Sequence, residues 1–221
     1  RQTIAIGRLN VKICGASSGM SDFGDGATHQ CVEDLALFRA VPNMTVICPA
    51  DANETVEAVK AIVEYDGPCY LRLNRNDYPN VTPEGKKFEI GKPYVLRDGK
   101  DIAVCATGYM VAAAKEAAEL LKGEISVKVI NVPTLKPLDE ECLRRLVGEC
   151  GGVITAEEHN IIGGLGSAVA EIFRKDKKPV DFVGIEDKFG CSAHNYKELL
   201  EYYGLTKEHI SAAIREMAAD K

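Results

Sequence analysis

An aspartate and a histidine stand four residues apart in the segment SDFGDGATHQCVEDLALFRAVPN, which runs from 21 to 43. Asp25 could bind a substrate hydroxyl and His29 could relay a proton, because a carboxylate accepts hydrogen bonds and an imidazole titrates near neutral pH. Glycines at 24 and 26 let the backbone turn sharply and approach a ligand. The same pattern is typical of a capped loop, in which Asp25 holds backbone N–H groups and His29 starts a helix. The spacing alone leaves both interpretations open.

Two arginines, Arg72 and Arg75, lie at the end of the apolar run YLRLNRND. An arginine at the carboxyl end of a strand is well placed to clamp a phosphate or a carboxylate with two hydrogen bonds. Because side chains alternate along a strand, we expect only one of the two to face a site, and Arg75 lies further toward the crevice. The alternative is a surface ion pair, for which this acidic chain offers many partners.

A charged cluster of Glu157, Glu158 and His159 ends another apolar run and precedes a glycine-rich turn in TAEEHNIIGGLGSAVAE. Glycines at the start of a helix suggest a nucleotide-binding loop. However, their spacing is not G-x-G-x-x-G, and no Lys-Ser or Lys-Thr pair follows them. We therefore predict that these glycines let the start of a helix pack tightly against a sheet.

Apolar, β-branched runs alternate with segments of helical period along the chain. Continuous apolar strands between helices are typical of parallel sheets buried on both faces, so we predict an α/β fold with two doubly wound domains and mostly parallel sheets. The first domain, 1–75, is incomplete, because its three strands are fewer than a typical sheet contains. The expected strands are 9–15, 44–50, 68–74, 102–108, 125–132, 152–158 and 180–186, and the expected helices are 29–41, 52–67, 109–123, 138–150, 165–175, 196–204 and 207–218.

The alternation lapses between the two predicted domains. Residues 76–100 contain three prolines, three glycines and many charges. Such a composition predicts an interdomain linker, with one short edge strand near Tyr94–Leu96. Residues 101–221 then form the second domain.

The two helices of the first domain carry local signals. Thr28 is the expected N-cap of the first helix, because its hydroxyl can accept a hydrogen bond from the first turn. The second helix is amphipathic, with valines at helical spacing and Gly67 as its stop signal. We expect these valines to face the core: Val56, Val59 and Val63.

The composition disfavours several classes of partner. The chain has 221 residues, of which 46% are hydrophobic, and its net charge is −6. A chain with this negative charge is repelled by negatively charged phosphates. We therefore expect it to bind neither nucleic acid nor an acidic membrane surface. No apolar run approaches the roughly 20 residues that cross a bilayer. The eight cysteines form no Cys-x-x-Cys pair, which predicts reduced thiols, no metal site and a cytoplasmic location.

Three segments of the first half closely resemble the pyrimidine-binding domain of transketolase: LNVKICG, GDGATHQCVEDLALFRAVPNMTVICPAD and GPCYLRLNR. Four later segments resemble the transketolase C-terminal domain and imply a flavodoxin-like second domain: IAVCATGYMVAAAKEAAELL, NVPTLKPLDEE, ITAEEHNIIGGLGSAVAE and KFGCSAHNYKELLEYYGLT. The likeness covers essentially the whole chain, and the D-G-x-T-H-Q block is its most specific piece. A fragment of 1-deoxyxylulose-5-phosphate synthase or of a 2-oxoacid dehydrogenase β-subunit is an alternative, because both share the two-domain layout.

The resemblance implies transfer of a two-carbon ketol unit between sugar phosphates, in the pentose phosphate pathway, with thiamine diphosphate and Mg²⁺ in the complete enzyme. By position, Asp25 matches an aspartate that binds a hydroxyl of the donor sugar, and His29 matches a catalytic histidine near the reacting centre. Arg75 matches an arginine that clamps the sugar phosphate. Ser17 stands eight residues before the aspartate, where the family usually has a histidine, so it would contact substrate without carrying imidazolium charge.

The resemblance also sets limits on this chain. In the family, an earlier segment supplies the glutamate that protonates the cofactor's aminopyrimidine, and a further domain holds the diphosphate and Mg²⁺. We therefore expect this chain to contain half of a pyrimidine domain and a complete C-terminal domain, from a full-length or a split transketolase. We expect the chain alone to be inactive and to bind no cofactor. The expected partners are sugar phosphates, the diphosphate-binding domain or subunit, and a second copy in a dimer. A rival from another class is a non-catalytic oligomerisation or regulatory module.

Overall fold

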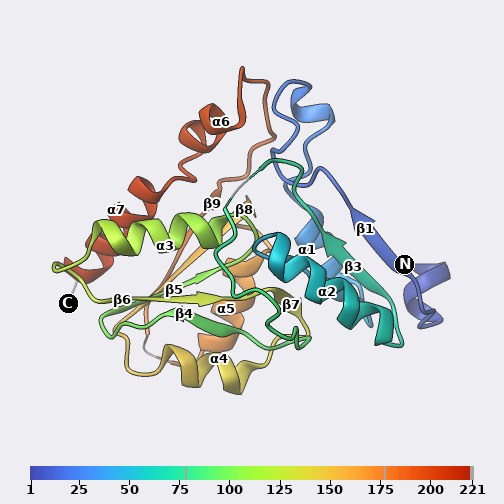
Figure 1. Ribbon diagram of the computed structural model, residues 1–221, viewed down its shortest axis with the longest axis horizontal. Coiled ribbons are helices and arrows are strands. Elements are labelled where there is room, and N and C mark those ends of the chain that lie inside the picture. Colours follow the sequence, from blue (N-terminus) through green and yellow to red (C-terminus); the bar gives the residue numbers. More distant parts are fainter. Residues whose placement is uncertain (78, 177, 220–221) are drawn as a thin grey trace.

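Two β-sheets lie next to each other in the computed structural model, which describes residues 1–77, 79–176 and 178–219 (Figure 1). Within these residues one sheet has the strand order β1-β3-β2-β7 and the other the order β4-β6-β5-β8-β9. No helix in the described ranges is long and apolar enough to cross a bilayer. The strands are β1 (Lys12–Gly15), β2 (Thr45–Ile47), β3 (Cys69–Arg72), β4 (Tyr94–Arg97), β5 (Ile102–Ala106), β6 (Val127–Asn131), β7 (Thr134–Lys136), β8 (Val153–Asn160) and β9 (Val180–Ile185). The helices are α1 (Asp34–Ala40), α2 (Ala52–Glu64), α3 (Met110–Leu120), α4 (Glu140–Val147), α5 (Leu165–Phe173), α6 (Tyr196–Tyr202) and α7 (Lys207–Ala219), with short helical turns at Gln2–Ile6 and Gly26–Thr28.

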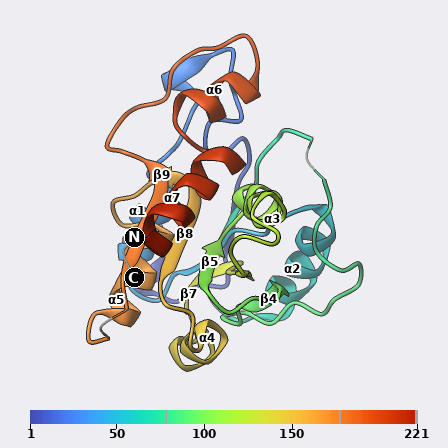
Figure 2. The same cartoon turned by 90° about the vertical axis from the view of Figure 1, so that its left-hand side faces the viewer.

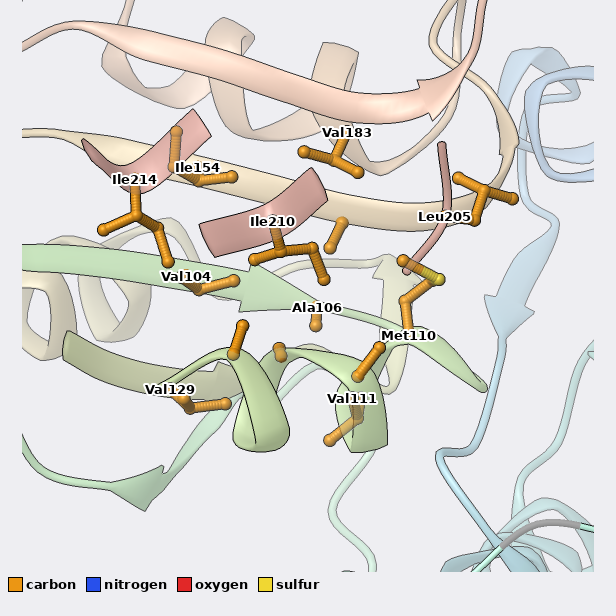
Figure 3. Packing of buried hydrophobic residues seen from close by; sticks show 14 of the residues in the cluster. Val104, Ala106, Met110, Val111, Val129, Ile154, Val183, Leu205, Ile210 and Ile214 are labelled. Atoms are coloured by element: carbon orange, nitrogen blue, oxygen red, sulfur yellow. The ribbon is translucent and has the colours of Figure 1, made fainter. Parts of the chain in front are cut away.

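Helices cover both faces of the five-stranded sheet (Figures 1 and 2). Strands β6, β5, β8 and β9 run parallel, and β4 pairs antiparallel with β6 as the edge strand expected near Tyr94–Leu96. On one face, Val104 and Ile154 of the strands pack against Val111 of α3 and Ile210 of α7 (Figure 3). Helices α4 and α5 cover the other face. The predicted α/β class with mostly parallel sheets is confirmed.

The four-stranded sheet takes one strand from the second half of the chain. β1, β3 and β2 run parallel, whereas β7 pairs antiparallel with β2 and places Thr134 opposite Ile47. The sequence did not predict this strand, because it has only three residues and is flanked by Pro133 and Pro137. The three predicted strands of the first sheet are therefore joined by a fourth that follows β6.

One hydrophobic cluster joins the two sheets. Val46 of β2 and Tyr70 of β3 share it with Ile130 of β6, Leu143 of α4 and Leu165 of α5. Each of these side chains is at most 5% exposed. Full burial of a large apolar side chain is worth about 1.5–3 kcal/mol. The two halves of the chain therefore stabilise each other through a common core.

Helix α1 begins at Asp34, five residues later than the predicted start at His29. The cause is a bridge between Cys31 and Gly19, whose N–H groups donate to each other's carbonyls at 3.0 and 3.1 Å. This extended pairing excludes helical backbone at Cys31. The prediction that Thr28 caps the helix is wrong, because Thr28 lies in a separate 3₁₀ turn and its hydroxyl bonds to Nδ1 of His29 at 3.0 Å.

The predicted buried face of α2 is also wrong. Val56, Val59 and Val63 are between 41% and 65% exposed, whereas Ala58 and Ile62, on the adjacent face of the helix, are at most 4% exposed. Both faces carry apolar residues at helical spacing, so the period of the pattern could not choose between them.

A buried carboxylate decides which face of α2 is inside. Glu54, in the first turn of α2, accepts hydrogen bonds from the Ala50 N–H at 2.7 Å and from the Tyr94 hydroxyl and the Asn131 amide at 2.8 Å. Burial raises the pKa of Glu54 above its usual value, and these three donors oppose that rise. Because Glu54 must face its donors, the valines must face away from them.

A pair of matched substitutions tests this orientation. We expect Ile62→Ala to lower the free energy of unfolding by about 2–4 kcal/mol, because it removes buried methyl groups and leaves a cavity. Val59→Ala should change it by about 0.5 kcal/mol or less, because that side chain is 41% exposed. Urea denaturation of both variants measures the difference. Equal losses would contradict the observed orientation of α2.

Candidate functional site

Strands β1 and β3 bring candidate residues to one edge of the four-stranded sheet. They pair in parallel, so the segments that follow them leave the sheet side by side. Ser17 follows β1 and Arg75 follows β3, and between these segments the Ser18 N–H donates to the Leu73 carbonyl at 2.9 Å. The carboxyl edge of a parallel sheet is the usual place for a ligand site.

The loop Ser21–Gln30, called the site loop below, carries Asp25 and His29 at this edge. Both side chains are exposed. Asp25 stands at the start of the Gly26–Thr28 turn, but in the described structure its side chain makes no capping hydrogen bond. Among the described residues, the His29 ring hydrogen-bonds to its neighbour, the Thr28 hydroxyl, at 3.0 Å. This geometry disfavours the interpretation of Asp25 as a cap and leaves both groups accessible.

Arg75 is held against the site loop by an ion pair. Its Nη1 lies 2.8 Å from Oδ2 of Asp22, and the side chains are 56% and 17% exposed, respectively. An exposed ion pair of this kind is worth about 0–1 kcal/mol. An anionic ligand could therefore replace Asp22 as the partner of Arg75 at little cost.

Arg72 points into the protein instead. Its side chain is 4% exposed, its Nε lies 2.9 Å from Asp34 Oδ2, and its Nη2 donates to the Glu158 carbonyl at 2.9 Å. The Tyr70 hydroxyl donates to the same Asp34 carboxylate at 2.6 Å. Burial opposes ionisation of Asp34, but the Arg72 charge and the hydrogen bonds from Arg72 and Tyr70 together outweigh it and lower the pKa of Asp34 below its usual value. The sequence signal for this network is an arginine inside an otherwise apolar strand, which requires a buried partner.

Ser17 adopts a backbone conformation that few residues tolerate. Its φ is +60°, in the left-handed region, and its side chain is half-buried. This conformation costs an L-residue about 1–2 kcal/mol, although histidine, asparagine and aspartate adopt it more readily than most. The backbone at this position therefore suits the histidine that the resemblance leads us to expect there.

The charged cluster Glu157–His159 is buried and holds a helix start. Glu157 accepts hydrogen bonds from the N–H groups of Leu165 and Gly166 at 2.6 and 2.7 Å. A Cβ atom on Gly164 would lie 2.0 Å from the Glu157 carboxylate, so the predicted tight packing is confirmed. Burial raises the pKa of Glu157 to about 7. Because this carboxylate takes the position at the helix start that a bound phosphate would need, a nucleotide cannot bind there.

Glu158 connects β8 to both segments of the candidate site. Its carboxylate accepts hydrogen bonds from the Met20 N–H at 2.7 Å and from the Asn74 amide at 3.0 Å. Asn74 also donates to the Tyr196 hydroxyl at 3.1 Å. Met20 precedes the site loop and Asn74 precedes Arg75, so one carboxylate fixes both. The sequence could not reveal this role, because the partners lie 138 and 84 residues away.

His159 links β8 to α1 in its neutral form. Its Nε2 accepts a hydrogen bond from the Ala36 N–H at 3.3 Å, and its Nδ1 lies 2.6 Å from the Asn160 carbonyl. Burial and the positive charge of Arg72 together lower the pKa of His159 to about 4. Protonation at Nε2 would remove the acceptor that α1 uses.

Two family models and several relatives match this chain. Residues 1–81 match the transketolase pyrimidine binding domain, and residues 91–210 match the transketolase C-terminal domain. A putative transketolase C-terminal section from Methanocaldococcus jannaschii is 43% identical over 221 residues, which cover 98% of this chain and 69% of the relative. A 6-deoxy-6-sulfo-D-fructose transketolase subunit from Clostridium sp. is 40% identical over 222 residues, which cover 99% of this chain and 68% of the relative. A solved structure described as a split gene transketolase, inactive beta4 tetramer, has a TM-score of 0.88 and 42% identity, covering 99% of this chain and 70% of that one.

The two joined sheets, with the candidate site at the edge of the first, define an α/β protein whose two halves match the two family models. The chain belongs to the transketolase family and corresponds to its C-terminal part. It spans slightly more than two thirds of the length of the relatives named above.

The described residues contain no cluster of metal-ligating side chains. Among them, no group of three or more His, Cys, Asp and Glu side chains is arranged to hold a metal ion. What the site loop and Arg75 offer is a carboxylate, an imidazole and a guanidinium at one edge of a sheet. These groups suit a hydroxyl, a proton and an anion, respectively.

Removing the charge of Asp34 should destabilise the chain strongly. We expect Asp34→Asn to lower the free energy of unfolding by about 3–5 kcal/mol, because it leaves the buried Arg72 guanidinium without its counter-charge. Asp22→Asn, which removes the partner of the exposed Arg75, should cost about 1 kcal/mol or less. Chemical denaturation of both variants gives the comparison, and similar losses would show that the buried pair contributes no more than the exposed one.

The burial of His159 should make stability depend on pH. Its folded pKa of about 4 lies below its usual value of 6.5, so the unfolded state binds more protons between these pH values. The free energy of unfolding therefore falls as the pH falls from 6.5 to 4, by about 3 kcal/mol for this group. His159→Gln should lack this component, while Glu157 titrates in both proteins. If the difference in the free energy of unfolding between wild type and His159→Gln stayed constant from pH 6.5 to pH 4, the prediction would be contradicted.

Proposed function

We propose that this chain supplies the sugar-binding part of a transketolase, which moves a two-carbon ketol unit between sugar phosphates. One observation carries the proposal: the exposed Arg75 is held at the carboxyl edge of a parallel sheet, against the loop that bears Asp25 and His29. A guanidinium there binds the phosphate end of a sugar through two charge-assisted hydrogen bonds. The loop then contacts the hydroxyls and the carbonyl.

Each accessible group has a role in this proposal. Asp25 accepts a hydrogen bond from a hydroxyl of the donor sugar, and His29 relays a proton or stabilises oxyanion charge at the reacting carbonyl. Ser17 donates a hydrogen bond from its hydroxyl but carries no charge. Thiamine diphosphate with Mg²⁺ supplies the carbanion chemistry when it is bound in the complete enzyme.

The anionic end of the substrate is the part that this chain specifies best. Arg75 is poised for a group with two acceptor oxygens, which a phosphate provides and a sulfonate provides as well. The relative named for 6-deoxy-6-sulfo-D-fructose shows by its name that the family includes a sulfonated substrate. We propose a sugar phosphate of the pentose phosphate pathway for this chain.

The proposed assembly includes a diphosphate-binding domain or subunit and a second copy of the chain in a dimer. The relative named as a C-terminal section and the structure named as an inactive beta4 tetramer support a protein that needs such a partner. The 221 residues alone are then inactive and bind cofactor poorly. All eight cysteines are free thiols, which supports a reducing, cytoplasmic location.

Reconstitution tests this function. The chain is combined with the diphosphate-binding part of the same enzyme, thiamine diphosphate and Mg²⁺, and is offered xylulose 5-phosphate with ribose 5-phosphate. Ketol transfer by the assembly, and none by the chain alone, is the expected result. Turnover of pyruvate in place of the ketose phosphate would instead assign the chain to a deoxyxylulose-phosphate synthase.

Substitution of Arg75 tests the phosphate contact. We expect Arg75→Ala to raise KM for the phosphorylated donor about 10- to 100-fold with a smaller change in kcat, because a lost charge-assisted contact is worth about 1.5–3 kcal/mol. Arg215→Ala removes an equally accessible arginine, paired with Glu124, and should leave both constants unchanged. If Asp25, His29 and Arg75 could all be replaced without loss of turnover, a non-catalytic module would be the better assignment.

A further inference from the structure

A segment from the C-terminal half of the chain contacts the site loop. The segment Gly190–Ala193, called the clamp segment below, lies between β9 and α6 and runs beside the site loop in both views (Figures 1 and 2). The Ala193 N–H donates to the Phe23 carbonyl at 2.9 Å. A segment from the other half of the chain therefore contacts the loop that bears the candidate substrate groups.

Gln30 forms the centre of this contact. Its side-chain amide donates to the carbonyls of Asp22 and Cys191, both at 3.0 Å, and the residue is 8% exposed. The two carbonyl acceptors fix the orientation of the amide, because only its NH₂ end can serve them. Its Oε1 is buried and finds no hydrogen-bond partner among the described residues. An unpaired buried acceptor costs about 1–3 kcal/mol, so stability alone does not account for this arrangement.

Two glycines make the close approach of the loop and the clamp segment possible. A Cβ atom on Gly190 would lie 1.7 Å from Gln30 Oε1. A Cβ atom on Gly26, which has a φ of +74°, would lie 2.4 Å from the Ser192 hydroxyl. A larger residue at Gly190 would therefore displace the Gln30 amide, and one at Gly26 would displace the Ser192 hydroxyl.

The contact continues to the proposed phosphate-binding group. Gln30 holds the backbone of Asp22, and the side chain of Asp22 holds Arg75 at 2.8 Å. His29 directly precedes Gln30 in the chain. Gln30 and Asp22 thus connect the clamp segment to Arg75 through two hydrogen bonds and an ion pair.

We propose that Gln30 is a positioning residue, through which the clamp segment holds the site loop and, by way of Asp22, Arg75 in the geometry that binds the anionic end of the substrate. This gives the C-terminal half a role in substrate binding although it contributes none of the candidate substrate contacts. The inference rests on the proposed function for its substrate, but the positioning itself can be measured without turnover.

The first test is hydrogen exchange of residues 22–30 in the assembled enzyme without sugar. We expect Gln30→Leu and Gly190→Ala each to raise exchange in this segment at least 10-fold, because one removes both donors and the other displaces the amide. Gly7→Ala is the matched control, since an added Cβ there meets no atom nearer than 3.5 Å. Unchanged exchange in both variants would overturn the inference.

A double substitution separates positioning from general damage to the fold. In Gln30→Ala the two closest contacts of an added Gly190 Cβ atom, to the side-chain amide, disappear, and only the Cβ atom of residue 30 remains, at 3.1 Å. Adding Gly190→Ala should therefore have little further effect on exchange. Additive effects in the double variant would overturn the inference, because the two residues would then act independently. This comparison holds even if one of the single variants is less stable.

The second test uses kinetics of the assembled enzyme. Gln30→Leu and Gly190→Ala should raise KM for the phosphorylated donor about 10-fold and change kcat less than 3-fold. A fall in kcat with an unchanged KM would overturn the inference. Hydrogen exchange tests the positioning role, whereas turnover by the wild-type assembly tests the proposed function. Either hypothesis can therefore fail without the other.

Discussion

The guanidinium of Arg72 is buried where β3, α1 and β8 meet, and its charge must be compensated there. Asp34 of α1 supplies the counter-charge, and the Glu158 carbonyl of β8 accepts a further hydrogen bond. A buried charge that loses its partner costs several kcal/mol, so these elements cannot separate while the chain stays folded. The position of β8 relative to the four-stranded sheet, and hence of one half of the chain relative to the other, depends on this interaction.

The positions of the segments that carry the candidate site depend on that arrangement. Once β8 is fixed, the Glu158 side chain reaches the backbone of Met20 and the amide of Asn74, which flank the site loop and Arg75. The groups that would meet substrate stay exposed, while the groups that position them are buried. Accessible residues can therefore keep a defined geometry at low energetic cost, because the buried residues beneath them supply the rigidity.

The sequence predicted most of the fold, because strand and helix periods are local. It failed where a distant partner decides the outcome. The period of the apolar pattern could not orient α2, because the orientation depends on donors to Glu54 from Tyr94 and Asn131, which lie far away along the chain. Strand β7 is too short to be recognised without its partner β2. The candidate substrate residues could be named from local motifs. The roles of Glu158 and Gln30 could not, because their partners lie far away along the chain.

The antiparallel strand β7 belongs by sequence to one half of the chain and by hydrogen bonding to the other. A cut between residues 81 and 91, where the two family models part, would leave β2 with an open edge that can pair with other chains. The same strand restricts recombination: exchanging C-terminal halves between homologues also exchanges one edge of the sheet that carries the site. Whether a chimaera of this family folds would then depend on how well Thr45–Ile47 pairs with Thr134–Lys136, rather than on the linker.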